Sequence, residues 1–77
     1  MNDGLARTPA ELGALVRARR RALGATQIEL AALADVGARF VVELERGKPT
    51  LELGRVMRVL AQLGLELVIR ERDGAGR

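Results

Sequence analysis

The chain has 77 residues, enough for one small domain, and carries a formal net charge of +3 at pH 7. The absence of Cys, His and Ser excludes a disulfide framework, argues against a structural zinc site and removes the usual catalytic nucleophiles and bases, so we expect no enzymatic activity, no metal and no cofactor. No apolar run approaches the roughly 18 residues of a membrane span, and MNDGLART lacks a signal-peptide pattern, so we expect a cytoplasmic protein without a membrane partner.

The first expected helix follows a short leader. Residues 1–7 are expected to form a flexible N-terminal arm. The run Thr8-Pro9-Ala10-Glu11 predicts a helix start, with Thr8 as the N-cap, Pro9 in the first helical position and Glu11 three residues after the cap. Gly24 is a natural stop for this helix, which carries most of an Arg-rich run. Arginine suits phosphates and guanine edges, but an Arg-rich, GC-biased proteome produces the same bias.

Two short helices joined by a turn come next. The run Thr26-Gln27-Ile28-Glu29 is a second capping box and opens a helix that runs to about Ala34. The turn is Asp35-Val36-Gly37, and the third helix is expected over 38–46, stopped by Gly47 and Pro49. Two short helices around a tight turn, preceded by a basic helix, indicate a protein that lays one helix in the major groove of DNA.

The end of the chain predicts a fourth helix and then a strand. Thr50 is expected to cap a helix that continues to Gly64. Residues 65–71, LELVIRE, alternate between apolar and polar with one exception and predict a β-strand. A lone strand leaves its backbone donors and acceptors unpaired, so we expect it to pair with the same strand of a twofold-related copy. Residues 72–77 are expected to be a disordered tail.

The fourth helix has an apolar band wider than one small core needs. A core of this size seldom supplies more than about 3–5 kcal/mol of net stability without a disulfide, a metal or a partner chain. We therefore expect a homodimer, although a fully covered helix in a compact bundle is the alternative interpretation. The expected dimerisation residues are Val56, Val59, Leu63, Leu65, Leu67 and Ile69.

The spaced motifs LGALVRARRRALGATQIELA and VGARFVVELERGKPT resemble the Xre/Cro-type, λ-repressor-like helix-turn-helix domain, over about residues 9–71. With LGLELVIRE attached, the chain more specifically resembles HipB-type antitoxins. The resemblance implies a mainly α, four-helix domain spanning residues 8–71, with the C-terminal strand pairing across the homodimer. It also implies a sequence-specific, nucleoid-associated transcriptional autorepressor that neutralises a HipA-like kinase toxin. The alternatives are a stand-alone Xre-family repressor without a toxin partner and a protein-interaction module with a degenerate DNA face.

The resemblance also assigns supporting residues. Thr26 and Gln27 open the second helix, where family members hold a backbone phosphate, and a helix N-terminus attracts anions. The alternative is that Thr26 only caps the helix and Gln27 is a solvated surface residue. Arg20 and Glu45 occupy the positions of a partly buried ion pair that ties the first helix to the third. Arg46, which follows Glu45, and Lys48 suit contacts with backbone phosphates.

The third helix carries the positions that read bases in the family. Arg39 can fork onto guanine O6 and N7, Ala38 and Val42 can touch a thymine methyl, and Glu43 can accept from cytosine N4. Arg39 and Glu43 can instead pair with each other on the surface, because they are four residues apart. A dimer places two such helices about 34–36 Å apart, so the expected operator in double-stranded DNA is an inverted repeat.

Two positions depart from the family pattern. The turn usually has Gly where Asp35 stands, and Asp tolerates the left-handed conformation that such a turn uses. Ser or Thr usually caps the third helix where Gly37 stands, so this helix is expected to begin with a weaker cap. The expected buried face of the third helix is Phe40, Val41 and Leu44.

Overall fold

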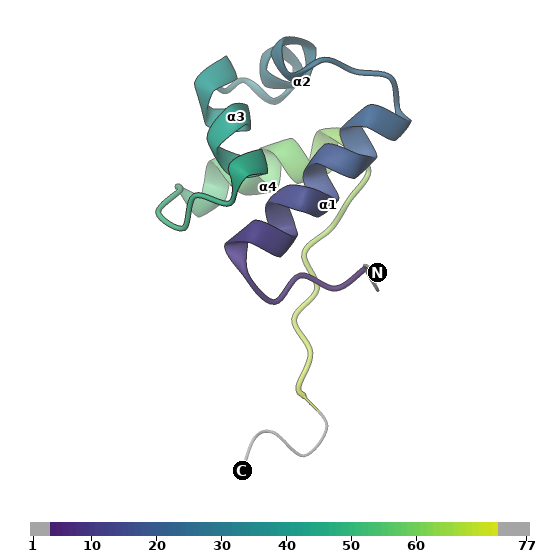
Figure 1. Cartoon of the computed structure of the whole chain (residues 1–77), viewed down its shortest axis with the longest axis vertical. Coiled ribbons are helices and arrows are strands. Elements are labelled where there is room, and N and C mark those ends of the chain that lie inside the picture. The colour runs from purple at the N-terminus through teal and green to yellow at the C-terminus, as the bar shows by residue number, and fades with distance from the viewer. Residues whose placement is uncertain (1–3, 73–77) are drawn as a thin grey trace.

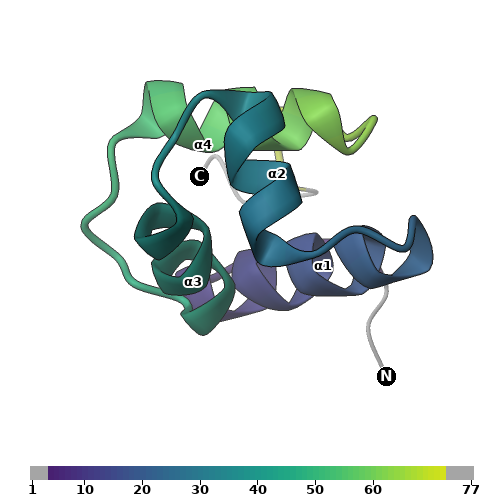
Figure 2. The ribbon, with the colours of Figure 1, turned by 90° about the horizontal axis from the view of Figure 1, so that it is seen from above.

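The computed structural model describes residues 4–72. These residues form four helices: α1 (Pro9–Ala22), α2 (Gln27–Ala34), α3 (Ala38–Arg46) and α4 (Leu53–Gln62). α2 and α3 lie above α1 and α4 in Figure 1, and the view from above in Figure 2 shows α2 between α1 and α4. α3 packs against both α1 and α2, and α2 packs against α4. The predicted mainly α, four-helix domain is therefore confirmed.

Threonine hydroxyls begin both of the first two helices, as predicted. The Thr8 hydroxyl accepts a hydrogen bond from the Glu11 backbone N–H at 3.1 Å, and the Thr26 hydroxyl accepts one from Glu29 at 3.0 Å. At α2 the capping box is reciprocal, because the Glu29 carboxylate accepts the Thr26 N–H at 2.8 Å. The hydrogen bonds from the Thr26 backbone and side chain hold the pKa of Glu29 below its ordinary value. At α1, Glu11 instead accepts the N–H of Arg7 at 2.6 Å.

The turn between α2 and α3 is fixed by a side chain from α4. Asp35 adopts the left-handed conformation with φ 55°, which Asp tolerates, and Gly37 precedes α3 without a side-chain cap. Arg58 donates from Nε to the carbonyl of Ala34 at 3.0 Å and from Nη2 to the carbonyl of Asp35 at 2.9 Å. The carbonyls at the C-terminus of α2, which have no partner within the helix, are thereby satisfied and the turn is tied to α4.

The core draws side chains from all four helices. It consists of Val16, Leu30, Ala31, Ala34, Val41, Leu44, Val56, Val59, Leu60 and Leu63, with Leu12, Val36, Phe40, Leu51 and Leu65 partly buried against it. The prediction that Val56, Val59 and Leu63 form a dimer interface is therefore wrong. These positions recur three or four residues apart and form the inward face of α4, whereas Leu53 and Met57 at the edge of that face are exposed.

The start of α4 also differs from the prediction. Thr50 does not cap the helix, because α4 begins at Leu53 with Glu52 as the N-cap residue and no side-chain cap bond. Pro49 and Thr50 belong to the α3–α4 loop, and Leu51 is partly buried against the core. Packing of Leu51 keeps the chain non-helical until Glu52, which has an extended backbone (φ −66°, ψ 121°).

The C-terminal segment, residues 65–72, leaves the end of α4 and runs away from the helices (Figure 1). Among residues 4–72 there is no β-strand, so the predicted strand at 65–71 is not confirmed. A strand needs a second strand for its ladder, and the described part of one chain supplies none. Leu65 packs partly on the core, whereas Leu67 and Ile69 are 50% and 91% exposed.

The predicted N-terminal arm and C-terminal tail fall partly outside the described residues, which exclude 1–3 and 73–77. Within the described part of the chain, no helix has both the length and the apolar character needed to cross a membrane.

Candidate nucleic-acid interface

The face of α3 that points away from the core is open to solvent. Ala38 and Arg39 at its start are exposed, and the Arg39 side chain is 89% exposed. Val42 and Glu43, one turn later, are half-buried, and Arg46 at the end of the helix is exposed. The opposite face carries the buried Val41 and Leu44 and the half-buried Phe40. The residues expected to read bases therefore lie together on one accessible side of α3.

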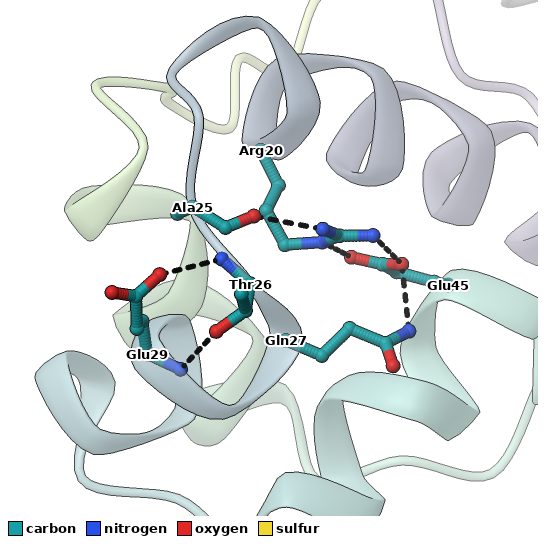
Figure 3. A network of polar contacts seen from close by, with 6 residues as sticks. All are labelled: Arg20, Ala25, Thr26, Gln27, Glu29 and Glu45. Atoms are coloured by element: carbon teal, nitrogen blue, oxygen red, sulfur yellow. Dashed lines mark hydrogen bonds and ion pairs between the residues drawn. The ribbon is translucent and has the colours of Figure 1, made fainter.

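A buried ion pair fixes α3 against α1. Arg20 donates from Nε to Glu45 Oε2 at 2.7 Å and from Nη2 to Glu45 Oε1 at 3.0 Å (Figure 3). The two side chains are 11% and 3% exposed. Arg20 also donates from Nη1 to the carbonyl of Ala25 at 2.8 Å, and Gln27 donates from Nε2 to Glu45 Oε1 at 3.0 Å. One arginine thus joins α1, the α1–α2 loop and α3, and Gln27 adds α2.

The network keeps both members of the pair charged. Burial by itself raises the pKa of Glu45, but the hydrogen bonds from Arg20 and Gln27, with the positive charges of Arg20 and Arg17, outweigh it and lower the pKa. The hydrogen bond to Glu45 raises the pKa of Arg20 further above its ordinary value, against the effect of burial. A buried pair of this kind adds little net stability but orients the elements that it joins, because removing either partner leaves the other charge stranded.

Two residues that were predicted to hold a phosphate instead make hydrogen bonds within the protein. The Gln27 amide nitrogen is engaged with Glu45, and Gln27 is half-buried rather than a solvated surface residue. The Thr26 hydroxyl accepts from the Glu29 backbone N–H, which is the capping role of the alternative interpretation. Both residues therefore have structural roles, and contact of either residue with a phosphate stays a prediction.

A shallow hollow lies where α1, the start of α2 and α3 meet. It is lined by Arg17, Arg20, Gly24, Ala25, Thr26, Gln27, Val42, Glu45 and Arg46. Arg20 is neutralised by Glu45, but Arg17 and Arg46 are exposed and have no ion-pair partner among residues 4–72. The hollow therefore has a positive rim next to the exposed face of α3.

The other predicted cations share a carboxylate. Glu43 Oε2 lies 3.4 Å from Arg39 Nε and 3.3 Å from Lys48 Nζ. In the chain without DNA, Arg39 and Glu43 thus form the surface ion pair of the alternative interpretation. Of the three predicted DNA-contacting cations at α3, only Arg46 has no ion-pair partner in the described residues.

Sequence reasoning missed the residue that sets the distance between α1 and α3. A Cβ placed on Gly13 would clash with the carbonyl oxygen of Leu44 and lie 2.7 Å from that of Glu45. Only glycine allows α1 to approach the last turn of α3 this closely. The sequence signal for this role is a glycine inside a predicted helix. Glycine destabilises a helix interior, so its presence there indicates close packing.

Sequence reasoning also missed two arginines whose side chains donate to the last carbonyls of other helices. Arg58 closes α2, as described above, and Arg19 donates from Nε to the carbonyl of Leu63 at 2.9 Å, which closes α4. Nothing in the sequence distinguishes Arg19 from its neighbours Arg17 and Arg21, because all three belong to the same basic run. Their different roles follow only from how the helices pack.

Comparisons with known proteins agree with this geometry. The family model described as helix-turn-helix matches residues 16–69. The chain is also 51% identical, over 63 residues, to the uncharacterized HTH-type transcriptional regulator y4mF of Sinorhizobium fredii. That alignment covers 82% of this chain and 83% of the relative. The matched segment includes the ion pair, the turn and the exposed face of α3.

Proposed function

The chain belongs to the helix-turn-helix family, and we propose that it is a DNA-binding transcriptional regulator that places α3 in the major groove. The observation that carries this proposal is the exposed leading face of α3, held from behind by the Arg20–Glu45 pair. A helix that reads base edges must be presented in one orientation, since each contact depends on placement within a few tenths of an ångström. The bidentate pair supplies that constraint.

Base reading falls to the first turns of α3. Arg39 is long, exposed and able to donate two parallel hydrogen bonds to guanine O6 and N7. Ala38 and Val42 are the apolar positions beside it and suit a thymine methyl group. Glu43 suits a cytosine amino group, which can donate to its carboxylate.

Backbone contacts fall to the positive rim of the hollow. Arg17 and Arg46 have no ion-pair partner in the described residues and are the cations best placed to neutralise phosphates. Thr26 and Gln27 at the N-terminus of α2 line the same hollow, and a helix N-terminus favours an anion. These contacts position the protein without reading sequence. Lys48 contributes once it is released from Glu43.

We propose a homodimer built through the C-terminal segment. Residues 65–71 form neither helix nor strand within one chain, and Leu67 and Ile69 expose apolar side chains that a twofold-related copy of the segment can cover while pairing with its backbone. The exposed Leu53 and Met57 of α4 offer further apolar area. Two copies then present their recognition helices about 34–36 Å apart to an inverted-repeat operator.

The finer role that we propose is that of an autorepressor and antitoxin, which binds its own promoter in the nucleoid and neutralises a HipA-like kinase toxin. The support is the resemblance to HipB-type antitoxins together with the apolar C-terminal segment. The second candidate is a stand-alone Xre-family repressor, favoured by the relative from Sinorhizobium fredii, which is named as a transcriptional regulator. The apolar Ala38 and Val42 are the basis for the third, a protein-interaction module that has lost DNA binding.

Binding to the DNA upstream of its own gene, measured over a range of salt concentrations, tests the regulator proposal. Each neutralised phosphate contributes about −0.9 to the slope of log affinity against log salt, so a clearly negative slope is expected. A slope near zero would contradict both repressor candidates and favour the protein-interaction module. Isolation of the chain from its native host, followed by identification of co-eluting proteins, separates the antitoxin from the stand-alone repressor. Co-elution of a kinase-like protein supports the antitoxin.

A further inference from the structure

The charges on the exposed side of α3 are coupled, because one carboxylate serves two cations. Glu43 Oε2 lies between Arg39 Nε at 3.4 Å and Lys48 Nζ at 3.3 Å. The Glu43 side chain is 25% exposed, so its carboxylate lies closer to the protein than the almost fully exposed Arg39. The three groups together carry a charge of +1 rather than the +2 that the two cations would present alone.

The backbone holds Lys48 in this arrangement. α3 ends in a turn in which Gly47 has φ 86°, the Gly47 N–H donates to the carbonyl of Leu44 at 3.0 Å and the Lys48 N–H donates to the carbonyl of Glu43 at 3.0 Å. These are the two hydrogen bonds of a Schellman motif. Lys48 is therefore anchored to Glu43 twice, once through its backbone and once through its ammonium group. The position of Lys48 follows from the helix end and does not depend on the weak surface ion pair alone.

The arrangement weakens attraction to any DNA backbone. A phosphate that approaches Arg39 or Lys48 must compete with a carboxylate already at 3.3–3.4 Å, and that carboxylate repels the phosphate. Arg17 and Arg46 have no ion-pair partner among residues 4–72, so a phosphate that approaches them displaces no paired carboxylate. Arg17 and Arg46 can therefore bind the backbone of DNA of any sequence, whereas Arg39 and Lys48 are held by Glu43.

We propose that Glu43 is a specificity-determining residue that restrains Arg39 and Lys48 on non-cognate DNA and releases them on cognate DNA. The inference rests on the proposed DNA binding through α3. Guanine O6 and N7 replace Glu43 as the acceptors for Arg39, while a base amino group, such as cytosine N4, donates to the freed carboxylate. Where the facing base offers only acceptors, the carboxylate is repelled and the ion pair persists. Glu43 thus acts chiefly by penalising wrong sequences.

A purely structural role for Glu43 makes a different prediction. An exposed pair four residues apart contributes a few tenths of a kcal/mol to an isolated helix, and such a pair affects all DNA sequences equally through folding. The two roles are therefore separated by the ratio of cognate to random affinity, which a structural effect does not change.

The test compares Glu43→Gln with Glu52→Gln. Both substitutions remove one negative charge, but Glu52 lies at the start of α4 and pairs with Arg55 at 3.7 Å, away from α3. Affinity is measured for the promoter DNA and for a random duplex of the same length, between about 50 and 200 mM salt, where released counterions dominate the binding of random DNA. Each protein is first checked for native helical content by circular dichroism.

We expect Glu43→Gln to raise the affinity for the random duplex about tenfold at the lowest salt and to steepen its salt slope by up to about 2, since two cations become available. The affinity for the promoter is expected to rise much less, so that the ratio of promoter to random affinity falls by up to about tenfold. Glu52→Gln is expected to leave this ratio unchanged. Adding Lys48→Gln to Glu43→Gln is expected to remove about 1 from the steepened slope.

An equal change of the ratio in Glu43→Gln and Glu52→Gln overturns the inference, and so does a double variant that keeps the full gain. The proposed function fails separately, if the unaltered chain shows no salt-dependent binding to either DNA. A result in which the unaltered chain binds but Glu43→Gln leaves the ratio unchanged contradicts only the role given to Glu43.

Discussion

The helical body, residues 8–64, and the C-terminal segment, residues 65–72, satisfy their polar and apolar groups in opposite ways. In the body, the core is covered by the chain itself, and no buried side-chain nitrogen or oxygen in the described residues lacks a hydrogen-bond partner. In the segment, Leu67, Val68 and Ile69 are exposed and the backbone forms no ladder. The helix-turn-helix unit thus satisfies its own groups within one chain, whereas the segment leaves apolar side chains exposed to solvent. Mutations should therefore separate the two regions by what they disturb.

The largest effect is expected from removing one partner of the buried ion pair in the body. Glu45→Ala leaves the Arg20 guanidinium without its carboxylate in a nearly inaccessible site, which costs about 3–5 kcal/mol in comparable proteins. Chemical denaturation followed by circular dichroism measures the free energy of unfolding. An unfolding free energy within about 0.5 kcal/mol of the unaltered chain, the range typical of surface changes, would contradict the role of the pair.

A second test of the body uses two glycines that both lie inside helices. Gly13→Ala places a Cβ against the backbone carbonyls of Leu44 and Glu45, so α1 and α3 must separate, at a cost of about 1–3 kcal/mol. Gly54→Ala is the matched control, because its Cβ meets only the end of the Glu52 side chain at 3.8 Å and alanine favours a helix by up to about 1 kcal/mol. Denaturation midpoints that move in the same direction for both variants would refute the close approach at Gly13.

Acid is expected to weaken the body through Glu45. The folded-state pKa of Glu45 is lowered below the ordinary value of 4.5, so its contribution to stability is complete above that value and is lost as pH falls through the lower folded pKa. Glu45→Gln removes this part of the pH dependence while keeping the side-chain size. The measurement is the free energy of unfolding from about pH 7 to pH 3, which spans the carboxylate range. Equal pH slopes for the variant and the unaltered chain would contradict the shift.

The smallest effect on the body is expected from changes in the C-terminal segment. Leu67→Asp with Ile69→Asp alters exposed side chains and should change the stability of the monomer by no more than about 0.5 kcal/mol. The same pair of substitutions should abolish the dimer, because two negative charges per chain replace the apolar contacts of the paired segments. Analytical ultracentrifugation measures the mass, and the unfolding midpoint of the unaltered chain should depend on its concentration. A variant that remains a dimer and binds its operator equally well would contradict pairing through this segment.

The same division explains how much of the molecule was predictable. The bounds of the first three helices follow from local signals, such as the Thr8 and Thr26 caps and the stops at Gly24 and Gly47, because each of these acts within one turn. The start of α4 was predicted wrongly, since Thr50 is a good cap by composition but the packing of Leu51 moves the helix start to Leu53.

The inward face of α4 was not predictable from its sequence. Its apolar band is wide enough to offer two faces, and only the positions of α1 and α2 decide that Val59 is buried while Met57 is exposed. The arginines present the same difficulty, because Arg19 and Arg20 are adjacent and chemically identical. One closes α4 and the other pairs with Glu45, and the family resemblance alone pointed to the second role. Among the candidate DNA contacts, the sequence placed Arg39 correctly on an open face but did not predict that Lys48 shares its carboxylate.

The most direct test of the central claim, that α3 is presented outward to read guanine in the major groove, is methylation interference on the promoter DNA. Methyl groups at guanine N7 block the position where Arg39 is proposed to donate. The account predicts that methylation of guanines in two half-sites, about one helical turn apart, prevents binding by the unaltered chain. It also predicts that Arg39→Ala binds more weakly and loses this sensitivity. Binding that is indifferent to methylation at every guanine, or equally sensitive with and without Arg39, would contradict the account.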